Sequence, residues 1–182
     1  PQSRRASPCT SPAHDTSSTD DMIDLQRALR HLAWSDAWLF DALSTYPDRA
    51  LSARYADGAS SVGELAKHIV DGAEWYRYCL TGELWTDIQV PVTGSDVAAL
   101  GQYVAVLDQL LITQGACEDE LMHFRDEQGA SSAMRSTLLT QAYLHSIEHR
   151  AQIACALEVC GFDRLDLDDA DLWAFERYES ST

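Results

Sequence analysis

The stretch HSIEHRAQIACALEVCG, residues 145–161, decides the fold, because it is patterned as a helix and carries two histidines one helical turn apart. The helical pattern begins near Arg135, runs to Cys160 and closes at Gly161, a residue suited to a left-handed helix end. Side chains four residues apart leave the same face of a helix with Cβ atoms about 5–6 Å apart. The stretch therefore predicts a long helix on which His145 and His149 can bind one metal ion.

Three further segments share this three- and four-residue spacing of apolar side chains. The expected helices run from Met22 to before Pro47, from Ser61 to Gly82, from Asp96 through Leu121, and from Arg135 to Cys160. Ser61 and Glu64 have the spacing of a capping box, and Ser95 is expected to cap the third helix. DEQGASS, residues 126–132, is expected to form a loop. Because no segment has a convincing strand pattern, we predict an all-α four-helix bundle.

The two ends of the chain differ from this pattern. Residues 1–20 are rich in Ser, Thr and Pro and offer little apolar surface, so we predict a disordered tail. Residues 21–182 are expected to form a single domain. Its acidic C-terminal extension carries several aromatic residues and is expected to pack across one end of the bundle.

Charge and composition exclude several classes of partner. The chain has 13 basic and 29 acidic residues, a formal net charge of −16, which repels nucleic acid and anionic membranes. No apolar run has the roughly 20 residues needed to span a bilayer, and no signal-peptide pattern is present. The five cysteines form no CxxC pair, and Cys155 and Cys160 are interpreted as packed, reduced thiols. A cytoplasmic location is expected.

The histidine pair allows more than one interpretation. Such a pair often serves only packing, but His68, at the edge of the second helix's buried face, offers a third imidazole. Three imidazoles with open positions are typical of catalytic rather than structural metal sites. HSIEH also matches the inverted zincin signature with Glu148 as base, although the scaffold that this class needs is missing. Asp36 is also a polar residue on a buried apolar stripe, that of the first expected helix.

Three segments together resemble the DinB-like superfamily of helical metalloproteins. The segments are HLAWSDAWLFDAL (31–43), SVGELAKHIVDGAEWY (61–76) and HSIEHRAQIACALEVCG (145–161). The resemblance implies that His68, His145 and His149 hold one divalent ion, zinc or nickel, in a cleft between helices. It places Asp36 where the family has an asparagine that faces the site, which makes Asp36 a candidate catalytic residue. Ala151 replaces the family's glycine between the Arg and the Gln.

The resemblance also implies a function. Its relatives include S-transferases that use bacillithiol or mycothiol, so a thiol-dependent S-transferase acting on small electrophilic molecules is expected, with a low-molecular-weight thiol as cofactor. Two alternatives stay open. One is a metal-dependent hydrolase with Asp36 or Glu148 as general base, and the other is a non-catalytic metal-binding stress-response module. A homodimer is expected from the relatives.

Overall fold

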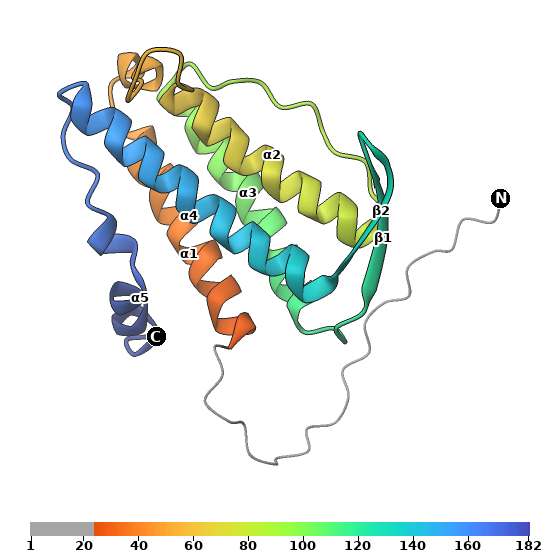
Figure 1. Ribbon diagram of the computed structural model, residues 1–182. Coiled ribbons are helices and arrows are strands. Elements are labelled where there is room, and N and C mark those ends of the chain that lie inside the picture. Colours follow the sequence, from red (N-terminus) through yellow and green to blue (C-terminus); the bar gives the residue numbers. More distant parts are fainter. Residues whose placement is uncertain (1–23) are drawn as a thin grey trace.

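Four long helices lie side by side in the computed structural model, which describes residues 24–182 (Figure 1). They are α1 (Leu25–Ser44), α2 (Val62–Thr81), α3 (Gly94–Gly115) and α4 (Arg135–Val159). Helix α1 packs chiefly on α3, and α2 packs on both α4 and α3. The prediction of a mainly helical chain is confirmed. The predicted tail, residues 1–20, and the start of the first helix at Met22 lie outside the described residues.

The helix ends follow local sequence signals. Ser61 and Glu64 form the predicted capping box, with the Ser61 amide donating to Glu64 Oε2 over 2.7 Å and Ser61 Oγ accepting from the Glu64 amide over 3.3 Å. Gly82 ends α2 in the left-handed conformation, with φ +76°. The predicted Ser95 cap is wrong. Thr93 caps α3 instead, because Asp96 stands three residues after it and completes a second capping box.

A β-hairpin occupies part of the segment predicted as helix and loop. Strands β1 (Leu121–Asp126) and β2 (Gly129–Met134) pair antiparallel and make the purely helical prediction wrong at this place. Alternate β1 residues point inward, and Met122 and Phe124 pack against the core cluster beside α2. The two-residue turn ends at Gly129, whose φ of +125° favours glycine. The hairpin thus covers one end of α2, as Figure 1 shows.

The C-terminal extension packs through its aromatic residues against the N-terminal half of α1, and through its 3-10 turn against α4, whereas the prediction placed it across one end of the bundle. A 3-10 turn (Leu167–Ala170) leads into α5 (Leu172–Glu179), and the ring of Phe175 lies 5.4 Å from that of Trp34. His31 is buried under this extension, 3% exposed, and its Nε2 is 2.9 Å from the Ala170 carbonyl oxygen. A second 3-10 segment (Asp48–Ser52) joins α1 to the start of α2. Across residues 24–182, no helix has the length and apolarity to cross a membrane.

Candidate metal centre

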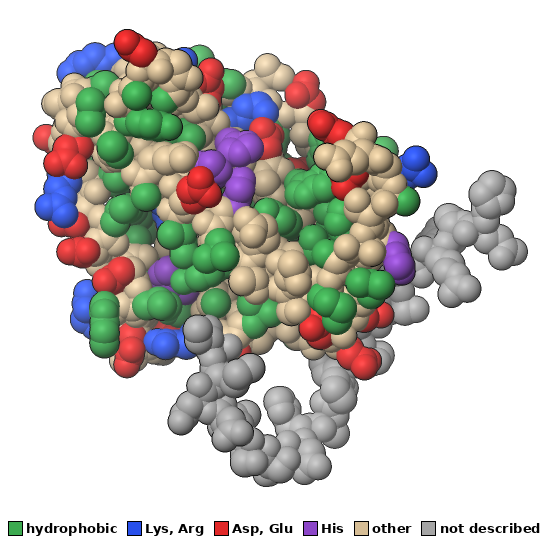
Figure 2. Space-filling view, in the orientation of Figure 1, with side chains coloured by type: hydrophobic (Ala, Val, Ile, Leu, Met, Phe, Trp, Pro, Cys, Tyr) green, Lys and Arg blue, Asp and Glu red, His purple; other side chains and the backbone are tan. Residues whose placement is uncertain are grey.

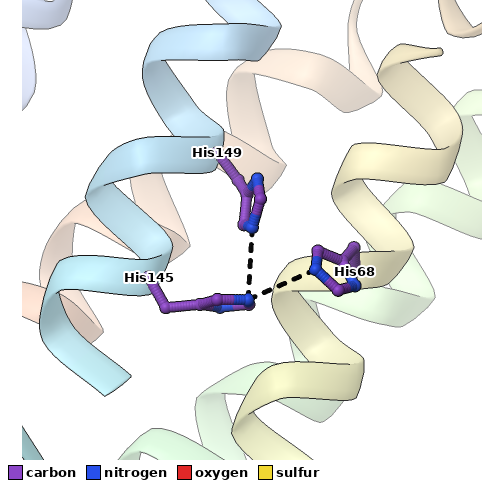
Figure 3. A group of neighbouring side chains, drawn as sticks. All are labelled: His68, His145 and His149. Atoms are coloured by element: carbon purple, nitrogen blue, oxygen red, sulfur yellow. Dashed lines mark hydrogen bonds between the residues drawn. The ribbon is translucent and has the colours of Figure 1, made fainter. Parts of the chain in front are cut away.

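Three histidines from two helices converge between α2 and α4. His68 comes from α2, and His145 and His149 come from successive turns of α4, as Figure 3 shows. Their Nε2 atoms point at one another: His145 Nε2 lies 3.3 Å from His68 Nε2 and 3.1 Å from His149 Nε2. The ligand atoms of all three lie within 4.8 Å of one another, so the predicted three-histidine group is brought together.

The two distances from His145 Nε2 are close to those between the ligands of a tetrahedral metal ion. Zinc–nitrogen bonds of 2.0–2.1 Å place two tetrahedral ligand atoms about 3.3–3.4 Å apart, close to the two separations observed. Hydrogen bonding alone does not explain the arrangement. His145 Nε2 faces two other nitrogens, and a single imidazole nitrogen either donates one proton or offers one lone pair. A cation at the centre would be met by three lone pairs at once.

Two neighbours fix the rings in this orientation. His149 Nδ1 lies 2.8 Å from Gln152 Oε1, and because an amide oxygen only accepts, Nδ1 carries the proton and Nε2 keeps its lone pair. Gly72 lies under His145, where an added Cβ would come within 2.4 Å of the ring's Cε1 atom. The glycine on α2 therefore lets the His145 ring pack directly against this helix.

The environment of the cluster favours neutral imidazoles. Burial, followed by the neighbouring His149 and His68, lowers the pKa of His145 to about 4. Burial and His149 also lower the pKa of His68, against the opposing effect of Asp71. Both rings are uncharged at neutral pH, which is the form that binds metals. Exposure increases from His149, which is 9% exposed, to His68, which faces solvent, so the site is open on one side.

Asp36 lies behind the cluster and is not among its ligand atoms. Its carboxylate is 1% exposed and accepts from Arg150 Nη1 over 2.7 Å and from Ser146 Oγ over 2.5 Å. Arg150 also donates to Ser35 Oγ over 2.5 Å. Burial raises the pKa of Asp36, while Arg150 and Ser146 oppose this rise. The buried network joins α1 to α4, and the catalytic role of Asp36 stays a prediction.

Other candidate residues of the sequence lie apart from the cluster. Glu148 is exposed on α4 and supplies no ligand atom to the group. The prediction that Cys155 and Cys160 are packed thiols is wrong, because both are exposed. Cys79 is buried in α2, and burial raises the pKa of its thiol to about 12. Within residues 24–182, no cysteine belongs to the candidate metal-binding cluster of His68, His145 and His149.

A cavity of about 820 Å³ opens along α2, next to the turn that carries His68, although none of the three histidines lines it. Figure 2 shows histidine side chains gathered over α2 and α4, with a hollow next to them. The cavity lies between α2, the segment after it and the hairpin. Most of its lining residues are charged and mainly acidic, and Trp75, Trp85 and Ile88 form its apolar part. Lys67 and Asp71, paired at 2.5 Å, line its edge and flank His68 on the same helix. Its volume is in the range of small-molecule sites.

Comparison with known proteins adds one family and one fold. The sequence model of the DinB family matches residues 18–177. A crystal structure of a DinB-like protein from Bacillus cereus is similar to this chain, with a TM-score of 0.60 and 19% sequence identity. The match covers 78% of this chain and 94% of that one. At this identity it shows the fold alone. None of the curated proteins matches the chain.

Proposed function

Because this chain belongs to the DinB family, we propose that it is a metal-dependent enzyme with one divalent ion, zinc or nickel, held by His68, His145 and His149. The observation that carries this proposal is the convergence of three histidine ligand atoms within 4.8 Å of one another, with His145 Nε2 at near-tetrahedral separations of 3.3 and 3.1 Å from the other two Nε2 atoms. The proposed scaffold is a DinB-type four-helix bundle made by α1 to α4. Three neutral ligands and an open side leave room for an exchangeable fourth ligand.

The proposed reaction is a thiol-dependent S-transfer. A divalent ion held by three imidazoles supplies a positive charge that lowers the pKa of a thiol or water brought to it. Within the described residues, the chain places no cysteine at the cluster, and the Cys79 thiol is held protonated by burial. A thiol nucleophile would therefore come from a separate small molecule. Its proton leaves to solvent, its sulfur bonds to the electrophilic carbon, and the leaving group departs with its electron pair.

The electrophile has a place in this proposal. The 820 Å³ cavity beside His68 can hold an organic molecule against Trp75, Trp85 and Ile88. Lys67 and Asp71 form the wall nearest the cluster, so a bound molecule would reach the metal site past this ion pair. The residues of the chain then have three tasks: His68, His145 and His149 hold the ion, Gln152 orients His149, and the aromatic wall excludes water from the apolar part of the substrate.

Metal content decides the first half of the proposal. Elemental mass spectrometry of untagged protein should find about one divalent ion per chain in the wild type and little in His145→Ala, which removes the central imidazole. The exposed variant Glu148→Ala is a matched control on the same helix and should keep the metal. No metal in the wild type, even after loading with zinc or nickel, would refute the metal site.

Turnover decides the second half. The metal-loaded protein, given an activated chloroarene with bacillithiol or mycothiol, should release chloride and form the thioether only when the thiol is present. His149→Ala should abolish this activity. Hydrolysis of an ester or amide without any thiol would contradict the S-transferase and identify a hydrolase. A metal-bound protein inactive with every thiol and every ester would instead be a non-catalytic binding module.

A further inference from the structure

A small cavity lies behind the metal centre, in the middle of the four long helices. Its walls include Asp36 from α1, Tyr76 from α2, Asp108 from α3, and His145 and Ser146 from α4. Its volume of about 10 Å³ is close to the space that one water molecule occupies. Such a space holds a water when several polar groups line it, which is the case here.

Two polar atoms of these walls need a partner. Asp108 is 1% exposed, and within residues 24–182 its Oδ2 is the one buried side-chain oxygen or nitrogen without a hydrogen bond. His145 uses Nε2 towards the other two histidines, so its proton lies on Nδ1 when Nε2 binds a metal. His145 makes its two hydrogen-bond contacts through Nε2, so Nδ1 has no partner within residues 24–182. Asp108, with an unpartnered buried acceptor, and His145, with an unpartnered donor at the ring edge beside Gly72, thus line one cavity.

We propose that this cavity holds one water molecule that accepts a hydrogen bond from His145 Nδ1–H and donates one to Asp108 Oδ2. This inference rests on the metal site proposed above. It makes Asp108 a positioning residue that acts on His145 through water, as Gln152 acts directly on His149. A hydrogen bond to the second nitrogen of a ligating imidazole fixes its tautomer and raises its basicity.

The position of Asp108 on α3 supports this role. The helix face that carries Asp108 also carries Val104, Leu107 and Leu111, all buried and apolar. An apolar residue at 108 would pack in the same place without the cost of burying a carboxyl group. Asp36 and Arg150 are near enough to influence Asp108, but no described hydrogen bond joins them to it. A water shared with His145 accounts for the buried acid.

Three variants of the full-length protein test the inference through metal affinity. Asp108→Leu removes the acceptor, whereas Asp108→Asn keeps one acceptor oxygen and the same shape. Leu111→Met changes an apolar wall of the same cavity with little change in volume. Dissociation constants for Zn²⁺ come from competition with a chromophoric chelator. The visible spectrum of the Co²⁺-loaded protein reports ligand geometry, which a general loss of stability would not change.

The expected result is a graded loss. Asp108→Leu should weaken Zn²⁺ binding by about 10-fold and shift the Co²⁺ bands, as the loss of such outer partners does elsewhere. Asp108→Asn and Leu111→Met should stay within roughly threefold of the wild type, below the effect of losing an outer partner. Affinity of Asp108→Leu equal to wild type, or an equal loss in Asp108→Asn, would overturn the inference.

A second measurement covers the case in which Asp108→Leu does not fold. A high-resolution crystal structure of the zinc-loaded wild type should show a water within hydrogen-bond distance of both His145 Nδ1 and Asp108 Oδ2. A direct contact between these two atoms, or a cavity without water, would refute the inference. Failure of the proposed function looks different, because the wild type itself would then bind no metal.

Discussion

Replacing Asp36 by leucine should destabilise the protein through the buried guanidinium that it leaves behind. The side chains of Asp36 and Arg150 are 2% and 5% exposed, and their contact joins α1 to α4. Removing one partner of a buried ion pair costs about 3–5 kcal/mol, because the remaining charge is uncompensated. Asp108 also lies near Arg150, and burial, followed by the charge of Asp36, raises its pKa. The loss of Asp36 removes the second of these causes, so Asp108 can compensate part of the charge of Arg150.

The lower end of that range therefore applies. We expect Asp36→Leu to lower the free energy of unfolding by about 3 kcal/mol, which for a domain of this size lowers the melting temperature by roughly 6–12 °C. Urea denaturation of the metal-free protein, followed by circular dichroism, measures the loss. Asp41→Leu, an exposed aspartate on the same helix, is the control and should change stability by no more than about 0.5 kcal/mol.

The double variant Asp36→Leu/Arg150→Met separates an ion-pair effect from a packing effect. With both charges removed, most of the lost stability should return, because apolar side chains of similar size replace buried pairs at little cost. Asp36→Leu as stable as the Asp41→Leu control would show that the pair contributes nothing to folding. A double variant less stable than Asp36→Leu would show that the network's hydrogen bonds to Ser35 and Ser146, rather than charge balance, carry the stability.

Three further predictions concern the histidine cluster. Gln152→Leu should weaken Zn²⁺ binding about 10- to 100-fold in a chelator competition, because His149 loses its acceptor, while Gln152→Glu should retain binding; equal affinity in Gln152→Leu would contradict the orienting role. Gly72→Ala should weaken metal retention measured by elemental analysis, because its Cβ would come within 2.4 Å of the His145 ring and displace it, whereas Gly58→Ala, which has open space around it but a left-handed φ of +77°, should cost stability and keep the metal. The free energy of unfolding of the metal-free protein should fall by up to about 3 kcal/mol as pH falls from 6.5 towards 4, because His145 takes up a proton in the unfolded chain but not in the folded one, where its pKa is lowered to about 4. Denaturant titrations across this pH range should show the fall in unfolding free energy, and His145→Gln should make it smaller.

The histidine cluster could be predicted because each part of it has a local signal. His145 and His149 are one turn apart on a strongly patterned helix, and His68 follows a capping box that fixes the phase of α2. When α2 and α4 pack with their apolar faces together, the three histidines, which lie on or at the edge of those faces, come close to one another. Gln152 lies on the same stripe, so its contact with His149 is a consequence of the same spacing.

The hairpin and Asp108 could not be predicted in this way. The alternation in LMHFRD spans only six residues, and its partner GASSAM is made largely of small side chains, so strand pairing rather than propensity decides the structure. Asp108 follows Leu107 in the sequence, and a single polar residue beside apolar ones does not interrupt the apolar pattern of a helix. Only the packing of all four helices shows that its carboxyl group is buried. The signal available in the sequence was the acid itself, between Val104 and Leu111.

A single turn of α4 connects the metal centre to the stability of the core. Successive residues of an α-helix point about 100° apart, so the turn that directs His145 and His149 towards α2 directs Ser146 and Arg150 towards Asp36 and Ser35 on α1. The His145 and His149 side chains therefore cannot tilt with the helix without moving the buried Arg150 guanidinium, which binds Asp36. The ion pair fixes the rotation of α4, and Gln152 then fixes the ring of His149 upon it. On this reasoning the buried charges serve placement: α4 could pack with apolar residues alone, but three imidazole nitrogens must meet at one point.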